Sequence, residues 1–313
     1  MEAHLFLPLF FLIVGICRGA QGVTFTFANN CGYTVWPGIL SNAGSPSMSP
    51  TGFELASGTS RSLQAPTGWA GRFWGRTGCA FDGSGQGGCR TGDCANRMEC
   101  DGAGAKGAAT LAEFSLGGFG GKDYYDVSLV DGYNLPLVVT VSGGSSAAAG
   151  PGWCATTGCA ADLNQRCPAE LRVEDDGGEE AACRSACDAF QRPEFCCAGD
   201  YANPNTCKPS YYAAIFKEAC PRAYSYAFDD ATSTFTCANA DYTITFCPNF
   251  TSQKASRDSS TPRTATGVVL SEEGWLATLA TADASSSRVV SFGCSVSIVI
   301  ASIIAMNANM LRL

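Results

Sequence analysis

The side chains that could do chemistry form an uneven set, with eighteen cysteines and a single histidine among 313 residues. That histidine is His4, just before an apolar N-terminal run, so a chain processed behind that run would contain none. Without histidine the protein cannot use Ser-His-Asp or Cys-His catalysis, and it has no imidazole for a metal site. Carboxylates are then the best candidates for acid–base chemistry, and we expect neither a metal nor another cofactor.

The cysteine count becomes informative once the two ends of the chain are set aside. Residues 1–22 combine a short apolar run with the small residues of Ala20-Gln21-Gly22, which is typical of a secretory signal peptide. Removing it together with the C-terminal tail takes away Cys17 and Cys294 and leaves sixteen cysteines. An even number behind a signal peptide indicates a disulfide framework with no free thiol. The residues alone leave about two million pairings open.

The C-terminal region indicates a stalk and an anchor. Residues 251–288 are rich in Ser, Thr and Ala and contain no cysteine, which favours a flexible stalk, either O-glycosylated or unmodified. Residues 289–313 form an apolar tail behind Ala284-Ser285-Ser286. Small residues before such a tail resemble a glycosylphosphatidylinositol signal, with Ser285 as the attachment site. Arg312 instead suits the alternative, a single transmembrane span.

The charge of the processed chain excludes further partners. Losing Glu2, Arg18, Arg288 and Arg312 leaves 17 basic and 27 acidic side chains, a net charge of −10. An acidic body repels nucleic acid and anionic lipid, so we expect neither as a ligand. At the end of this body, Asn249 begins the sequence Asn-Phe-Thr, an acceptor for N-glycosylation.

Short alternating segments predict a β-rich fold that would have to position these carboxylates. Strands are expected at 23–28, 34–36, 72–74, 111–114, 124–129, 137–141, 225–228 and 242–246. Turns rich in Gly, Pro and Asn separate them, which favours an antiparallel sandwich or barrel. Residues 179–190 and 211–220 are predicted helices inside a cysteine-rich lobe at 159–220.

Several strings of residues identify a family. They are Cys89-Arg90-Thr91-Gly92-Asp93-Cys94, Asn29-Asn30-Cys31, and the segments 33–38, 69–79 and 123–134. With the sixteen cysteines, they closely resemble the plant thaumatin-like, pathogenesis-related proteins, over residues 23–248. One departure follows Cys94, where the family usually has Gly or Gln and this chain has Ala95. We expect a local difference in that loop.

The resemblance implies a mainly β domain at 23–250. Its parts are a flattened antiparallel β-sandwich, a disulfide-rich helical lobe at 159–220 and a small loop lobe at 77–107. The resemblance also implies eight disulfides, which pair Cys31 with Cys247, Cys79 with Cys89, Cys94 with Cys100, Cys154 with Cys237, Cys159 with Cys220, Cys167 with Cys183, Cys187 with Cys196, and Cys197 with Cys207.

Family members carry an acidic cleft, and the resemblance places its five residues at Arg72, Glu113, Asp126, Asp131 and Asp229. Crowded carboxylates raise the pKa of one of them, which gives a proton donor beside a base, as glycoside hydrolysis requires. On this hypothesis Glu113 is the proton donor with the raised pKa, and Asp126 or Asp131 is the nucleophile or base. Four aromatic residues nearby in sequence could stack on sugar rings or belong to the core: Trp74, Phe114, Tyr125 and Tyr133.

The function that the resemblance implies is defence against fungi. The protein would be an extracellular monomer that binds β-1,3-glucan or a related cell-wall polysaccharide, with or without weak endo-β-1,3-glucanase activity. Its place would be the apoplast or the outer face of the plasma membrane. The alternative is a non-catalytic protein ligand, either an inhibitor of microbial hydrolases or a membrane-tethered interaction module.

The apolar tail leads to a test on intact cells. If Ser285 carries a lipid anchor, phosphatidylinositol-specific phospholipase C should release the protein, and the released protein should lack Cys294 because the tail is removed on processing. Immunoblotting of the supernatant and peptide mapping would measure both. Retention on the membrane, with peptides recovered from beyond residue 289, would establish the transmembrane alternative.

Overall fold

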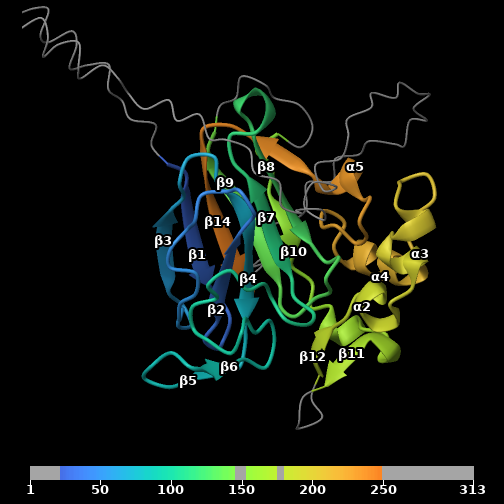
Figure 1. Cartoon of the computed structure of the whole chain (residues 1–313), viewed down its shortest axis with the longest axis horizontal. Coiled ribbons are helices and arrows are strands. Elements are labelled where there is room, and N and C mark those ends of the chain that lie inside the picture. Colours follow the sequence, from blue (N-terminus) through green and yellow to red (C-terminus); the bar gives the residue numbers. More distant parts are fainter. Residues whose placement is uncertain (1–21, 145–152, 175–179, 249–313) are drawn as a thin grey trace, which may run out of the picture. The chain divides into compact units, whose positions relative to one another are not determined.

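In a computed structural model of the chain, the residues described are 22–144, 153–174 and 180–248. They form two five-stranded sheets packed face to face and two small two-stranded sheets (Figure 1). The predicted signal peptide, Asn249, the stalk, Ser285 and the apolar tail lie outside these residues. Among the residues described, no helix has the length and apolarity needed to cross a membrane.

The first sheet has the strand order β10-β9-β14-β1-β3. Its strands are β1 (Thr24–Asn29), β3 (Ser60–Gln64), β9 (Leu137–Gly143), β10 (Thr157–Cys159) and β14 (Ala240–Phe246). Neighbouring strands are antiparallel except β1 and β14, which pair in parallel. The expected antiparallel sandwich is therefore confirmed with one exception, at the place where the first and last strands of the domain meet.

The second sheet has the order β13-β8-β7-β4-β2, and all its pairs are antiparallel. Its strands are β2 (Trp36–Ser41), β4 (Ala70–Arg76), β7 (Leu111–Ser115), β8 (Asp123–Ser128) and β13 (Phe235–Cys237). β2 begins at Trp36, where the strand expected at 34–36 ends. The expected strand at 225–228 is wrong, because Ser225 donates its backbone N–H to the Asp229 carboxylate and the chain turns there.

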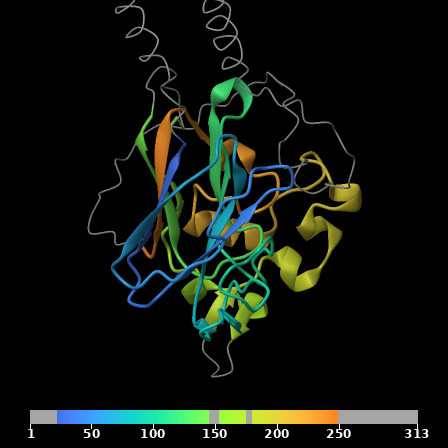
Figure 2. The same ribbon diagram turned by 60° about the vertical axis from the view of Figure 1, so that its left-hand side comes forward.

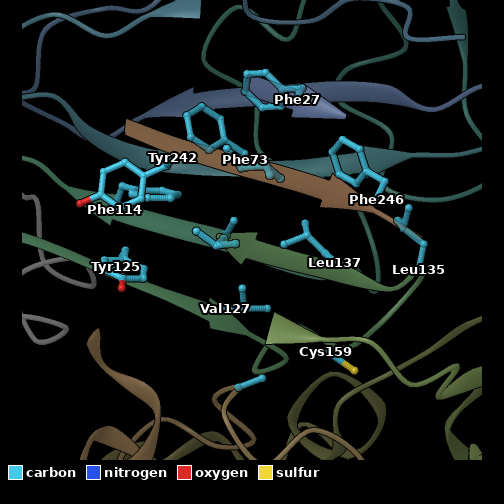
Figure 3. Packing of buried hydrophobic residues seen from close by; sticks show 14 of the residues in the cluster. Phe27, Phe73, Phe114, Tyr125, Val127, Leu135, Leu137, Cys159, Tyr242 and Phe246 are labelled. Carbon is cyan, nitrogen blue, oxygen red and sulfur yellow. The ribbon is translucent and has the colours of Figure 1, made fainter. Parts of the chain in front are cut away.

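An aromatic core fills the space between the two sheets (Figure 3). Phe25 of β1 packs against Phe73 of β4 and Phe114 of β7, with ring centroids 4.8 and 4.7 Å apart. Phe114 also meets Tyr242 of β14 at 5.1 Å. Period-two alternation places these side chains on the inner faces of their strands. Burying a large apolar side chain contributes about 1.5–3 kcal/mol, so this layer is a main source of stability.

Beside the sandwich lies the disulfide-rich helical lobe, with helices and a short hairpin (Figures 1 and 2). Its elements are β11 (Arg172–Glu174), β12 (Glu180–Cys183), α2 (Ala186–Phe190), α3 (Pro193–Cys196) and α4 (Tyr211–Ala219), followed by α5 (Asp230–Ser233). The helix expected at 211–220 is confirmed. The helix expected at 179–190 is wrong in its first half, because the Cys183 backbone exchanges hydrogen bonds with Tyr133 and pairs with Arg172. The helix begins only after Ser185, whose hydroxyl accepts from the Asp188 N–H.

The cysteines join in the same eight pairs that the resemblance implies. Cys79–Cys89 and Cys94–Cys100 lie in the small loop lobe, which also contains β5 (Ala80–Phe81) and β6 (Gly87–Gly88). Within it Ala95 has φ 58°, a left-handed conformation that favours glycine. Ala95 therefore adopts a backbone conformation that strains an alanine and would not strain a glycine. This is the local difference that we expected after Cys94.

The disulfides lead to a stability prediction. Replacing both Cys31 and Cys247 by Ala should cost about 5 kcal/mol, because this bridge spans 216 residues and the stabilisation grows with loop length. The same double replacement at Cys79 and Cys89, separated by 10 residues, should cost about 3 kcal/mol. Urea unfolding of the two variants measures the difference. Equal losses would contradict the loop-length argument.

Candidate functional site

A row of charged side chains crosses the outer face of the second sheet. Arg72 of β4 lies directly opposite Glu113 of β7, and Glu113 lies directly opposite Asp126 of β8. Residues directly opposite one another share a face, with Cβ atoms about 4.5–5.5 Å apart. Their neighbours along each strand, such as Phe73, Phe114 and Tyr125, point into the aromatic core. We call Arg72, Glu113 and Asp126 the cross-strand row.

The two carboxyls of the cross-strand row are buried, Arg72 is half-buried, and the hydrogen-bonding groups of the row are incompletely satisfied. The Arg72 Nε lies 3.6 Å from Glu113 Oε1, an ion-pair distance that is too long for a hydrogen bond. Glu113 is 8% exposed and Asp126 only 1%. The Arg72 Nε and both carboxyl oxygens of Asp126 are buried without a hydrogen-bond partner among the residues described. Leaving such groups unpaired costs about 1–3 kcal/mol each, so packing alone does not account for the row.

Burial has the largest effect on the pKa values of the two carboxyls in the cross-strand row. It raises the pKa of Glu113, an effect that the Arg72 charge opposes and the Asp131 charge reinforces. Burial also raises the pKa of Asp126 well above its usual range, with Glu113 adding to the effect and Arg72 opposing it. One arginine therefore does not compensate for the carboxylates around it, and the row holds protons more tightly than free carboxylates do.

Asp131 extends the row toward the helical lobe. It lies in the turn after β8 and lines a pocket of about 250 Å³ that α2 and α3 also line. The Asp131 side chain is exposed, yet the protein atoms around it desolvate it enough to raise its pKa, while Arg72 lowers that pKa and Asp188 of α2 raises it. Asp131 thus interacts electrostatically with the cross-strand row on one side and with the helical lobe on the other. Together Arg72, Glu113, Asp126 and Asp131 form one electrostatically coupled cluster, which we call the acidic groove.

Asp229 is held by other partners. Its carboxylate lies 2.8 Å from the Lys217 ammonium and accepts hydrogen bonds from Ser225 and Thr232. The adjacent Asp230, which the sequence analysis did not single out, instead raises the pKa of Asp126. In the sequence, the pair Asp229-Asp230 was the available sign that Asp230, as well as Asp229, could belong to the site. The turn into α5 shows that Asp230 is the one that affects the pKa of Asp126.

The aromatic residues near the row belong to the core. Trp74, Phe114, Tyr125 and Tyr133 are each at most 1% exposed, so none can stack on a sugar ring. The polar group of each of the other three rings donates a hydrogen bond to a backbone carbonyl: Trp74 to Gly92, Tyr125 to Ala155 and Tyr133 to Ala161. Among the residues described, no cluster of three or more His, Cys, Asp or Glu side chains is arranged to hold a metal ion.

The raised pKa of Asp126 predicts how stability depends on pH. Because the folded state binds this proton more tightly than the unfolded state, the free energy of unfolding falls as pH rises from about 4 through the folded pKa. Asp126→Asn cannot ionise, so it should be more stable than wild type at pH 7, with the advantage lost below about pH 4. Urea unfolding at both pH values measures this.

A matched variant tests whether the effect belongs to the row. Asp229→Asn makes the same chemical change at a carboxylate that is paired with Lys217, so it should lower stability at pH 7. If Asp126→Asn were as destabilising at pH 7 as Asp229→Asn, the Asp126 carboxyl would be satisfied in solution and the predicted shift would be wrong.

Comparison with known proteins agrees with this architecture. The chain matches the model of the thaumatin family over residues 29–248. It is 61% identical to thaumatin-like protein 1 of Arabidopsis thaliana over 238 residues, which cover 74% of this chain and 88% of the relative. It is 53% identical to pathogenesis-related protein 5 of the same plant over 240 residues, 77% of this chain and 95% of the relative.

A third relative carries the name of an enzyme. It is a glucan endo-1,3-beta-glucosidase of Prunus avium, 50% identical over 232 residues that cover 74% of this chain and 92% of the relative. The family match spans most of the chain, and the relatives are covered over most of their length. The chain therefore belongs to the thaumatin family.

Proposed function

We propose that the protein acts outside the cell in defence and binds β-1,3-glucan in the acidic groove. The observation that carries this proposal is that accessible charged groups meet here: the Arg72 side chain, 25% exposed, lies opposite Glu113, and the exposed Asp131 acts on the pKa of Glu113. A neutral polysaccharide presents hydroxyl groups that can both donate and accept, so its hydroxyls match carboxylates and a guanidinium without adding charge. The pathogenesis-related and glucanase names of the relatives support the same ligand class.

Hydrolysis of the bound glucan is a second candidate function. Glu113 favours it, because its raised pKa suits a proton donor and, at 8% exposure, its side chain is less completely buried than that of Asp126. Asp126 is 1% exposed and too deeply buried to touch a sugar, so the exposed Asp131, which lines the pocket, is the better base or nucleophile. Glu113 would protonate the glycosidic oxygen, and Asp131 would activate a water or attack the anomeric carbon.

The role of Asp126 in this scheme is to position charge. Its carboxyl lies directly opposite Glu113 on the neighbouring strand and has a strongly raised pKa. As a neutral acid, Asp126 adds no repulsion to an ionised Glu113. Removing the proton from both would place two negative charges side by side in a desolvated site. We propose that the pair holds at least one proton at neutral pH; because Asp126 cannot touch a sugar, that proton reaches the glycosidic oxygen only when it is on Glu113.

The proposed cellular setting follows from the two ends of the chain. A cleaved signal peptide at 1–22 would deliver the disulfide-rich domain to an oxidising compartment, and a lipid attached at Ser285, in place of the tail at 289–313, would hold it at the outer face of the plasma membrane. A tethered glucan-binding domain would meet fungal wall fragments at the cell surface. The stalk at 251–288 would provide the reach.

Substitution of Glu113 separates binding from hydrolysis. Purified protein should sediment with insoluble β-1,3-glucan, and Glu113→Gln should still do so because Gln keeps the shape and hydrogen-bonding capacity. If the protein hydrolyses the glucan, Glu113→Gln should slow release of oligosaccharides by about 10²–10⁴-fold. Chromatography of the supernatant measures turnover. Glu54→Gln, the same change at an exposed glutamate outside the groove, is the matched control.

The other possible results of this binding and turnover experiment separate the remaining hypotheses. Binding by both proteins with no oligosaccharide released by either would show a binding site without catalysis. Failure of wild type to bind glucan would overturn the proposed function, and the interaction-module alternative would then lead. A fall in turnover that Glu54→Gln shares would show an unspecific effect of removing a carboxylate.

A further inference from the structure

The pocket between the sheet and the helical lobe has a mixed lining. It measures about 250 Å³, and its walls include the Asp131 and Asp188 carboxylates, the Gln191 side chain and the apolar Val130 and Phe195. Pockets for drug-sized ligands are about 300–1,000 Å³, so this one suits a single ring and not a long chain. Such a lining offers both hydrogen-bonding groups and apolar surface, and a sugar ring has both kinds of surface.

We propose that this pocket is a subsite that binds one sugar unit of the glucan chain, with Asp188 and Gln191 as its specificity-determining residues. This inference rests on the proposed function, because it concerns how far the same ligand extends beyond the cross-strand row. It assigns the helical lobe a direct part in binding. Without such a subsite, the helical lobe would only border the acidic groove and would not contact the glucan.

The pocket adjoins the acidic groove through Asp131. This residue belongs to both, since it lines the pocket and carries a pKa that responds to Arg72 of the row and to Asp188 of the helical lobe. Two interstrand spacings separate Arg72 from Asp126, about 10 Å of sheet. Because Asp131 acts on the pKa of Glu113 and also lines the pocket, a ligand that contacts Arg72 and Asp131 lies at the edge of the pocket.

Local structure holds the two proposed side chains at the pocket wall. Asp188 lies in the first turn of α2, with its N–H donated to the Ser185 hydroxyl. Gln191 ends the helix in a left-handed conformation, φ 51°, and its Nε2 donates to the Asp188 carbonyl at 3.0 Å. Both side chains are exposed, so a ligand can reach them. Their backbone is fixed by the helix and by the Cys187–Cys196 bridge.

Phe195 supplies apolar wall instead of an open stacking surface. The guanidinium of Arg192 lies over its ring at 5.3 Å from the centroid, and the ring packs against Phe190 at 5.5 Å. Selectivity in the pocket thus depends on hydrogen bonds that the Asp188 carboxylate accepts and that the Gln191 amide donates or accepts. Hydroxyl recognition of this kind discriminates strongly, because a ligand lacking the hydroxyl leaves polar groups unpaired.

The inference predicts a dependence on the length of the ligand. Calorimetric titration with β-1,3-linked oligosaccharides of two to six glucose units should show a rise in wild-type affinity once the chain reaches the pocket. Asp188→Ala should weaken binding of the longer oligosaccharides about tenfold, the loss of one charge-assisted hydrogen bond, and leave the shorter ones unchanged. Gln191→Gly, which keeps the left-handed backbone, should act in the same direction.

Controls distinguish this inference from the proposed function. Asp200→Ala makes the same change at an exposed aspartate of the same lobe outside the pocket, and it should bind every length like wild type. Equal affinities of wild type, Asp188→Ala and Gln191→Gly at every length would overturn the subsite and leave groove binding intact. Wild type that binds no oligosaccharide and no insoluble glucan would overturn the proposed function and the subsite with it.

Discussion

The register of β4, β7 and β8 is the constraint on which both the core and the acidic groove depend. With a side-chain period of two, one face of these strands places Phe73, Phe114 and Tyr125 between the sheets, and the other lines up Arg72, Glu113 and Asp126. A slip of one residue in any pair would exchange the two faces. The aromatic layer, which favours one register strongly, thereby determines which charged side chains meet.

Two arginines of β4 show what distinguishes a structural from a functional charge. Arg76 is fully buried, and it donates hydrogen bonds to the carbonyls of Trp36, Arg97 and Met98. Burial lowers its pKa to about 10, and its contacts join the small loop lobe to the sheet. Arg72 lies four residues earlier on the same face, yet its Nε has no hydrogen-bond partner among the residues described. Arg72 is therefore less completely satisfied than Arg76, and its side chain, 25% exposed, is the one that meets the ligand in the proposed function.

The helical lobe depends on covalent links more than on a core of its own. Its helices are short, with α2 five residues long and α3 four, and isolated helices of that length are unstable in water. The Cys187–Cys196 bridge joins α2 to the end of α3, and Cys159–Cys220 connects β10 to the end of α4. Bridges of this kind let short, polar segments keep fixed positions beside the acidic groove, where the proposed subsite needs rigid walls.

The sequence by itself determined the β-rich class, the cysteine-rich lobe and, through the resemblance, the disulfide pairs and the positions of the acidic residues. Those features depend on local periodicity and on strings of residues that survive in order along the chain. The helix expected at 179–190 failed because Cys183 pairs with Tyr133, a partner fifty residues away that no local pattern reveals. Only the tertiary structure decided that Asp229 pairs with Lys217 while Asp230 acts on Asp126, and that Asp126 is too buried to touch a sugar. Burial and charge at a site are sums over neighbours from distant segments, so they exist only once the chain has folded.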